Sequence, residues 1–260
     1  MNPKPFVLLV SLVFIGTITF FVGPFITPSE TTDGGQRRTS VALPKVLREA
    51  SGLAKVDEKQ LLAHNDEKGH IYSISVPSLQ ITKLVSIGNP VVLDDFEGIA
   101  VNGDRIYMIT STGQLYVIRD VSFKTVGQTA DWIVLNTGLA AVCEVEGLHF
   151  DRGKLLIPCK KIYKRDGQKK SNKSRITVYS YIPGKDTEAK TLFSVTDDRL
   201  KGNKKAVTGI ESDANFYYLL TPATLLSIHR DTLSLALFPL DSKSHKQPEG
   251  IALMDNGSVF

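Results

Sequence analysis

Three glutamates, each followed by a glycine and an apolar residue, are the side chains best suited to do chemistry in this sequence. The copies are Glu97-Gly98-Ile99, Glu146-Gly147-Leu148 and Glu249-Gly250-Ile251, and two weaker copies carry Ser51 and Thr208 before the glycine. Carboxylates held close together repel one another, so they either take up protons or gather around a cation. Ca²⁺ suits such a set because it accepts about six to eight oxygen ligands, whereas zinc would want histidine or thiolate.

The spacing of this motif indicates how the glutamates are brought together. The glycines of the five copies are separated by 46, 49, 62 and 41 residues. A period in the forties, with short strands and turns inside each unit, is typical of a β-propeller blade. A propeller sets the same position of every blade at the same height around one axis. We therefore expect Glu97, Glu146 and Glu249 to form a ring at the mouth of the central channel.

Short β-branched and aromatic runs bounded by turn residues predict the strands of these units. Asn102-Gly103 and Thr112-Gly113 lie between such runs and are hairpin signals, because these loops need a positive φ. The expected strands are residues 61–64, 70–74 and 81–85 in the first unit, 97–101, 105–110, 114–118 and 131–135 in the second, 154–158 and 175–179 in the third, and 216–220, 225–228 and 235–238 in the fourth.

Five motif copies predict an all-β fold, a five-bladed β-propeller over residues 39–260, with about 44 residues in each unit. The fifth unit offers a strand at 249–253 and ends at Phe260 just after its second strand begins, so we expect the last blade to be truncated. Residues 40–43 are expected to add an outer strand to that blade and so to close the ring.

The N-terminal segment has the composition of a membrane span. Residues 6–27 form an uncharged, mostly apolar run of 22 residues, and a bilayer core asks for about 20. The run is longer than the apolar core of a signal peptide and lacks a good Ala-x-Ala cleavage site. We predict a signal anchor with one transmembrane helix in residues 1–27, followed by a flexible linker at 28–38. A cleaved signal is the alternative.

The two cysteines, Cys143 and Cys159, are predicted to be free and buried. A hairpin with Arg152-Gly153 at its tip would set position 159 opposite 146 rather than 143, which disfavours a direct bridge. A redox or zinc site is not indicated either, because the pair lacks the C-x-x-C spacing.

A basic stretch coincides with the longest interval between motif copies. Its cations are Lys160, Lys161, Lys164, Arg165, Lys169, Lys170, Lys173 and Arg175. We interpret it as a solvated hairpin insertion. The alternative is contact with nucleic acid or anionic lipid, but only Tyr163 interrupts the stretch, so the aromatic platforms of single-strand binders are missing. Nucleic acid is not an expected partner.

The ordered set of motifs at 46–54, 94–100, 146–148 and 247–252 resembles the SdiA-regulated family of bacterial inner-membrane or exported proteins. The resemblance covers nearly everything from about Leu43 to the end. It implies a five-bladed propeller behind an N-terminal membrane segment, a bound calcium ion and distant kinship to NHL-repeat propellers. It implies no established activity. The basic insertion and the early stop depart from the family.

Five glutamates are the candidate metal ligands. Glu97, Glu146 and Glu249 belong to the ring, Glu49 precedes Ser51 by two positions, and Glu211 follows Gly209-Ile210. The alternative is that a glutamate at the start of a strand only caps backbone amides of the next blade. The acidic turns at Asp66-Glu67 and Asp94-Asp95 are interpreted as surface loops.

No catalytic residue is nominated, because the sequence contains no G-x-S-x-G elbow, P-loop or HExxH motif. The sequence thus favours a binding module over an enzyme. We expect a single-pass inner-membrane protein, or alternatively an exported one, whose periplasmic propeller binds calcium and a small-molecule or protein ligand on one face. The alternative function is a calcium-dependent hydrolase of the lactonase, esterase or phosphoesterase type, with its site at the channel mouth.

Overall fold

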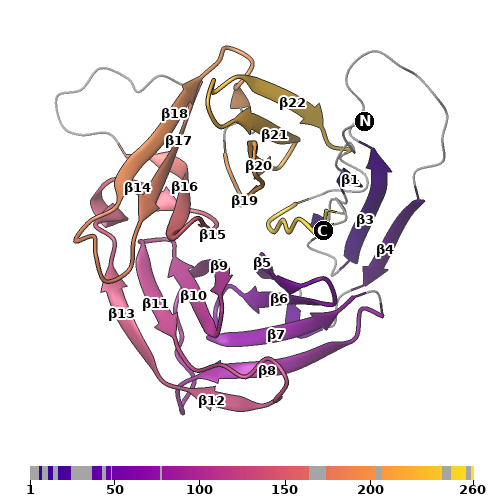
Figure 1. The fold of residues 1–260 in the computed structure, drawn as a ribbon, viewed down its shortest axis with the longest axis vertical. Coiled ribbons are helices and arrows are strands. Elements are labelled where there is room, and N and C mark those ends of the chain that lie inside the picture. The colour runs from indigo at the N-terminus through magenta and orange to yellow at the C-terminus, as the bar shows by residue number, and fades with distance from the viewer. Residues whose placement is uncertain are drawn as a thin grey trace.

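The structure is a computed structural model, and it describes residues 6–7, 11–13, 17–24, 37–42, 45–47, 49–76, 78–163, 174–202, 206–241, 247–255 and 259–260. These residues form a β-propeller in which four sheets radiate as blades from a central axis (Figure 1). The propeller fold is therefore confirmed, but five blades were predicted and four are found.

Each blade is a meander of antiparallel strands. The first contains β5 (Ala50–Asp57), β6 (Gln60–Asn65), β7 (His70–Ser75) and β8 (Ile81–Ile87); the second β9 (Phe96–Asn102), β10 (Arg105–Thr110), β11 (Gln114–Ile118) and β13 (Trp132–Asn136); the third β14 (Cys143–Val145), β15 (His149–Asp151), β16 (Lys154–Ile162), β17 (Arg175–Tyr181) and β18 (Lys190–Thr196); the fourth β19 (Gly209–Ser212), β20 (Phe216–Thr221), β21 (Thr224–His229) and β22 (Leu235–Pro239). The strands predicted in these four units are confirmed.

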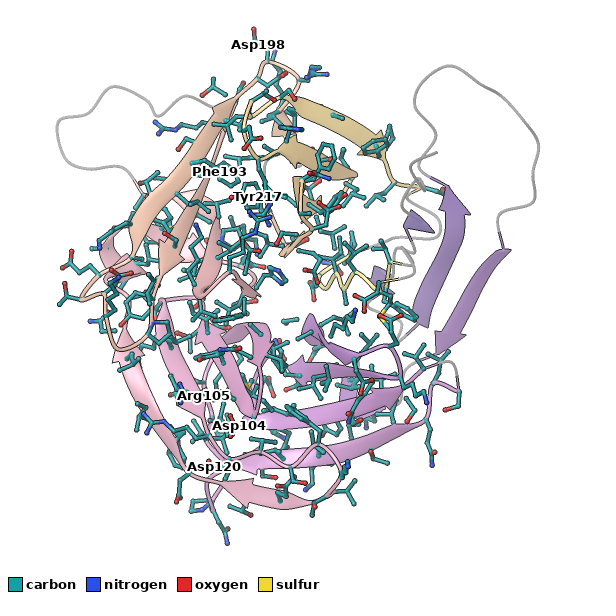
Figure 2. All side chains as sticks on the ribbon, viewed as in Figure 1. Asp104, Arg105, Asp120, Phe193, Asp198 and Tyr217 are labelled. Carbon is teal, nitrogen blue, oxygen red and sulfur yellow. A yellow bond between two sulfur atoms is a disulfide. The ribbon has the colours of Figure 1, made fainter. Side chains whose placement is uncertain are left out.

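The hydrophobic core lies between neighbouring blades. In β10, Ile106 and Met108 pack toward the first blade, whereas Tyr107 and Ile109 pack toward the third. Because both faces of such a strand are buried, its sequence is a continuous apolar run rather than an alternating one. Between the third and fourth blades, the rings of Phe193 and Tyr217 stack with their centroids 4.7 Å apart (Figure 2).

The motif glycines let the innermost strands approach one another around the axis. A Cβ added to Gly98 would lie 2.6 Å from the carbonyl carbon of Gly147, and one added to Gly147 would lie 3.1 Å from Cα of Gly209. Gly250 is equally close to the backbone of Gly52. Segments that carry all five motif copies thus surround one axis, and circular closure is confirmed.

The fifth motif copy does not open a blade. Residues 247–255 lie near the axis between the fourth and first blades (Figure 1), and within the described residues their strand-like pairing is a single bridge from Leu253 to Val259. Ile251, Ala252 and Phe260 fill the core that these two blades share. The motif predicted the position of this segment correctly but overstated the number of sheets, because one inner segment can close the ring without outer strands of its own.

The predicted N-terminal transmembrane helix is wrong for the described residues. They form a separate sheet of β1 (Phe6–Val7), β2 (Ser11–Val13), β3 (Thr17–Pro24) and β4 (Arg37–Ala42). No helix in the described ranges is long and apolar enough to cross a bilayer. The expectation that residues 40–43 extend the last blade is also wrong, because β4 pairs antiparallel with β3, with Ser40 opposite Thr19.

One strand crosses from the second unit to the first blade. β12 (Gln128–Ala130) pairs in parallel with β8, with Thr129 opposite Ser86. The connection between β11 and β13 thus reaches back to cover the outer edge of the preceding blade. This parallel addition removes an exposed edge from that sheet.

Cys143 and Cys159 form a disulfide, with their Cα atoms 5.9 Å apart, so the prediction of free thiols is wrong. The expected hairpin tip is present, since Arg152 and Gly153 both have positive φ. However, the register shifts between Glu144 and Val145, so that Val145 rather than Glu146 opposes Cys159. That irregularity sets Cys143 diagonally across from Cys159, within the range of a disulfide.

Candidate functional site

Acidic side chains gather where the innermost strands begin. We call this region the acid mouth and define it by Glu49, Asp66, Asp95, Glu97, Glu144, Glu146, Lys160 and Glu249. Adjacent blades are joined there by their backbones: the amide of Gly147 donates to the carbonyl of Glu97 at 2.7 Å. On the far side of the ring, the Thr208 hydroxyl donates to the carbonyl of Pro248 at 2.6 Å. The inter-blade bonds hold the motif carboxyls at one level.

Lys160 provides the cation of the acid mouth. Its ammonium group donates a hydrogen bond to Oε1 of Glu146 and lies 3.8 Å from Oε1 of Glu144. The Glu146 side chain is only 7% exposed, whereas that of Lys160 is 40% exposed. Glu146 is thus a buried carboxylate of the acid mouth, and its partner is the ammonium of Lys160, whose side chain extends inwards from the solvent.

Burial and mutual repulsion raise the pKa values of the ring glutamates. Desolvation, followed by the charges of Glu146 and Asp95, raises the pKa of Glu97 to about 9. Desolvation and the charge of Glu146 raise the pKa of Glu249 to about 7, although Lys160 opposes the shift. The pKa of Glu146 is also raised by desolvation, against the lowering effect of Lys160. Hence Glu97 binds a proton at neutral pH.

The structure brings together four of the five predicted site residues. Glu97, Glu146 and Glu249 influence one another's ionisation, as the ring prediction requires. Glu49 is exposed at the rim and adds to the repulsion felt by Glu249 and Asp66. Glu211 does not join them.

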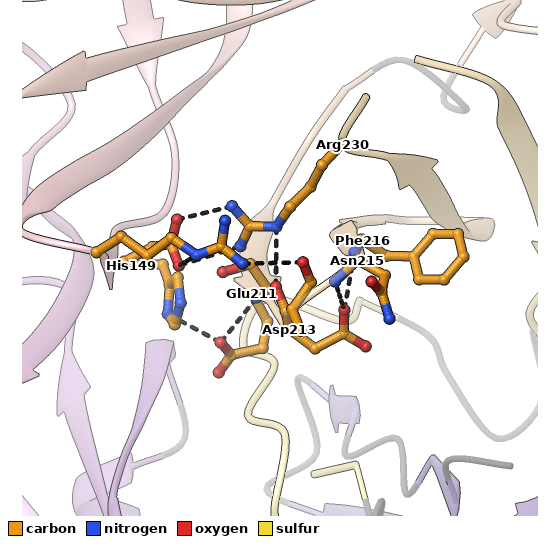
Figure 3. A network of polar contacts seen from close by, with 10 residues as sticks. His149, Glu211, Asp213, Asn215, Phe216 and Arg230 are labelled. Carbon is orange, nitrogen blue, oxygen red and sulfur yellow. Dashed lines mark hydrogen bonds and ion pairs between the residues drawn. The ribbon is translucent and has the colours of Figure 1, made fainter. Parts of the chain in front are cut away.

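Glu211 lies at the opposite end of the innermost strands. Its carboxylate accepts hydrogen bonds from the backbone amides of Ser212 at 2.8 Å and Leu253 at 3.3 Å. It also contacts Nδ1 of His149 at 2.9 Å (Figure 3). Through the amide of Leu253, Glu211 caps the backbone of the next segment, as the alternative describes. Its role as a metal ligand stays a prediction.

Sequence reasoning missed the contributions of Lys160, Asp95 and Glu144. Lys160 was assigned to the solvated insertion, but β16 continues through Ile162 and keeps this lysine in the sheet. A signal for Lys160 was available in the sequence. The hairpin register that sets 159 opposite 146 also sets Lys161 opposite Glu144, and the structure shows this pairing between β14 and β16. The first lysines of the basic stretch therefore lie beside Glu144 and Glu146. Asp95 was interpreted as part of a surface loop, yet its charge acts on both Glu97 and Glu146. Residues 164–173 of the insertion lie outside the described residues.

The described residues do not form a ready calcium site. Among them, no three side chains of His, Cys, Asp or Glu lie close enough to hold a metal ion. Glu146 already has a cationic partner, the ammonium of Lys160. Calcium binding stays a prediction.

A cavity of about 330 Å³ lies at the other end of the channel. We call this end the opposite mouth and define it by Lys55, His149, Asp151, Arg152, Glu211, Ser212 and Asp255, which all line the cavity. Its charges are paired. Arg230, which lies behind this lining, makes two hydrogen bonds to Asp151, at 2.9 and 3.0 Å (Figure 3), and its guanidinium lies 4.3 Å from the centre of the Tyr217 ring.

Comparison with known proteins supports the fold. No family model matches the chain, and no curated protein matches it. Glutaminyl cyclase from Myxococcus xanthus aligns with 82% of this chain and 84% of its own, at a TM-score of 0.50 and 16% identity. A structure of a nidogen/laminin complex aligns with 94% of this chain and 96% of its own, at a TM-score of 0.51 and 16% identity.

The fold and the charged channel define a β-propeller, an architecture compatible with a ligand- or protein-binding module. At such low identity, the likeness to solved structures concerns the fold alone. The resemblance to the SdiA-regulated family stays a prediction.

Proposed function

We propose that this chain is an extracytoplasmic binding module whose acid mouth takes a ligand that presents a primary ammonium group. The observation that carries the proposal is Lys160, whose own ammonium is hydrogen-bonded to Glu146 in that mouth. The site thus already accommodates this chemical group. Within the part of the chain that the structure describes, Glu97 and Glu249 supply further carboxyls that have no hydrogen-bonded cation of their own, so a second ammonium has partners there.

The raised pKa values support a cation as the ligand. Glu97 and Glu249 retain protons because desolvation and neighbouring charges disfavour their ionised forms. A bound cation would reverse the second effect and release those protons. Calcium is the competing cation, but an ammonium needs fewer ligands, and no three His, Cys, Asp or Glu side chains among the described residues are placed to hold a metal ion.

The disulfide supports placement outside the cytoplasm. Bridges such as Cys143–Cys159 persist in oxidising compartments and are rare where cellular thiols are kept reduced. Kinship with the SdiA-regulated family would also imply export. We include both the kinship and the export in this proposal.

Calorimetric titration tests the proposed ligand. The probes are Nα-acetyl-lysine amide, its uncharged counterpart Nα-acetyl-norleucine amide, and CaCl₂, each at constant ionic strength. We expect the lysine probe to bind and the norleucine probe not to bind. The heat should vary with the ionisation enthalpy of the buffer, because Glu97 and Glu249 release protons.

The double variant Glu97→Gln/Glu249→Gln should bind the lysine probe at least about tenfold more weakly. Glu188→Gln, which changes an exposed glutamate elsewhere, is the matched control and should bind as the wild type does. Tighter binding of Ca²⁺ than of the lysine probe, abolished by the double variant, would replace the ammonium with calcium. Absence of binding by both cations would refute the proposal.

A further inference from the structure

The opposite mouth encloses a cavity of a size that suits a small molecule. Its volume of about 330 Å³ lies at the lower end of the range for ligand pockets, roughly 300–1,000 Å³. The cavity lies where β9, β15 and β19 end, so its walls come from several blades and do not depend on one flexible loop. Val101 and Phe150 provide apolar surface, and the Phe150 ring is stacked parallel to Tyr107 behind it.

The charged groups of this mouth already have partners. Asp151 is held by Arg230, with side chains 10% and 8% exposed. Lys55 contacts Glu58 at 2.6 Å and is also paired with Asp255. Arg152 is the exception, since it is 59% exposed and lies 3.9 Å from Asp151. A charged ligand would otherwise be desolvated beside groups that already have partners, which is unfavourable. A neutral ligand avoids that penalty.

His149 presents a fixed hydrogen-bonding atom to the cavity. Glu211 engages Nδ1 at 2.9 Å, and the Glu211 side chain is itself only 7% exposed and anchored by two backbone amides. When the ring is neutral, this carboxylate holds the proton on Nδ1, so that Nε2 is an acceptor. The His149 side chain is 21% exposed and lines the cavity, so the nitrogen that Glu211 does not engage is left for a ligand.

Two further polar groups complement this acceptor. Ser212 lines the cavity, and its hydroxyl is buried without a hydrogen-bond partner among the described residues. A rotation of this side chain towards the cavity would let a bound molecule satisfy the hydroxyl. Arg152 donates from Nη2 to the carbonyl of Ala214 at 2.9 Å, and its side chain is 59% exposed, so other N–H groups of its guanidinium face solvent. Donors and acceptors are thus both available.

We propose that this cavity binds a small uncharged molecule with several hydroxyl groups, of the size of a monosaccharide or cyclic polyol, with His149 Nε2 accepting a hydrogen bond from one hydroxyl. Hydroxyl groups donate and accept, as the mixture of His149, Ser212 and Arg152 requires. The C–H faces of such a molecule suit Val101 and Phe150. This site is separate from the acid mouth and takes a ligand of different charge.

Amide-detected NMR titration of the full chain tests this proposal. The probes are D-glucose and myo-inositol, with D-gluconate and D-glucosamine as charged counterparts, each raised to about 50 mM, a range suited to weak binding. We expect the neutral probes to shift the amides of residues 149–153 and 210–213. The charged probes should shift them less.

Two variants separate a binding role from a structural one. Ser212→Ala removes a hydroxyl that bonds nothing in the described residues, so it should leave the melting temperature unchanged and weaken binding about threefold or more. His149→Gln should weaken binding about tenfold. Glu188→Gln, which changes an exposed glutamate outside both mouths, is the control and should leave the affinity for the neutral probes unchanged.

Three results would overturn the inference. The first is the absence of amide shifts in these segments with either neutral probe. The second is stronger binding of gluconate or glucosamine than of glucose. The third is wild-type affinity in a folded Ser212→Ala protein and a folded His149→Gln protein, which would make the His149–Glu211 pair only a tie between blades.

Discussion

The acid mouth and the opposite mouth belong to the same ring of inner segments, yet they treat charge in contrasting ways. Among the residues that define the acid mouth, seven carry a carboxyl group and one, Lys160, carries an ammonium group. At the opposite mouth, Asp151 is paired with Arg230, Glu211 with His149, and Asp255 with Lys55. One mouth carries excess negative charge, whereas the other is nearly balanced.

The difference in charge pairing indicates that buried carboxylates have two different roles in this protein. Where each acid has its own cation, the pair ties neighbouring segments together and contributes mainly to the architecture. Where acids outnumber cations, they take up protons and oppose folding, and a structure retains them only at a cost. That uncompensated set is what favours the acid mouth as the site of a cationic ligand.

The largest loss of stability is expected from a substitution that disrupts the packing of the innermost strands, which position both mouths. Gly98→Ala adds a methyl group 2.6 Å from the backbone of Gly147, and the backbone has no side-chain rotamer through which to yield. We expect a loss of at least about 4 kcal/mol in the free energy of unfolding, measured by urea denaturation.

Gly103→Ala is the control for this substitution. Gly103 has a φ of 61° but nothing within 4 Å of an added Cβ. It should lose only about 1 kcal/mol, from backbone strain. Equal losses in the two variants would contradict the close approach of the inner strands.

The next effect tests pairing at the opposite mouth. Arg230→Met leaves Asp151 buried without its bidentate partner, so we expect a loss of about 3–5 kcal/mol. Arg199→Met removes a similar fork from Asp197, but Arg199 is 57% exposed. Its loss should be much smaller, because solvent screens an exposed pair. Thermal and chemical unfolding of both variants would show whether burial decides the outcome.

A smaller effect is expected from the cation of the acid mouth. Lys160→Met removes the only ammonium near Glu146 among the described residues, and the lysine is 40% exposed, so solvent screens part of the loss. We expect a destabilisation of about 1–2 kcal/mol at pH 7. Lys161→Met removes the same charge from the next position and should change the stability by less than about 0.5 kcal/mol. Indistinguishable variants would mean that Lys160 does not stabilise this mouth.

A further effect has the opposite sign, and its size depends on pH. Because the pKa of Glu97 is raised from 4.5 to about 9, the folded state retains a proton that the unfolded state releases between these values. The resulting cost is absent below pH 4.5 and grows as the pH rises towards 9. Glu97→Gln lacks this group, so it should match the wild type near pH 4.5 and exceed it by about 2 kcal/mol at pH 6, with a larger difference at pH 8.

Unfolding midpoints across this pH range, with Glu188→Gln as the control, provide the measurement. A constant difference between Glu97→Gln and the wild type would show that Glu97 is not desolvated.

Much of this arrangement follows from local sequence signals. The strands of the four blades were predictable because turn pairs such as Asn102-Gly103 bound short β-branched runs. The ring of Glu97, Glu146 and Glu249 was predictable because a repeated motif occupies a repeated position. Glycine in that motif has a steric reason, the contact between Gly98 and Gly147.

Other features depend on information that a linear pattern lacks. Apolar length alone predicted a helix in residues 1–27, although the composition of β3, rich in Thr, Ile, Phe and Val, suits a strand equally well. The disulfide depends on a register shift of one residue beside Val145. Lys160 reaches the acid mouth only because β16 extends beyond Pro158. Such long-range pairing details are decided by packing rather than by composition.

Because β12 of the second unit pairs with β8 of the first blade, we expect the first two blades to unfold together. Thr129 lies within the second unit but completes the sheet of the first, so neither blade can detach without opening the other. We expect the amides of β8 and β12 to exchange with solvent water together, as one cooperative segment. A chimaera that replaces blades of this propeller would therefore have to replace residues 50–136 together.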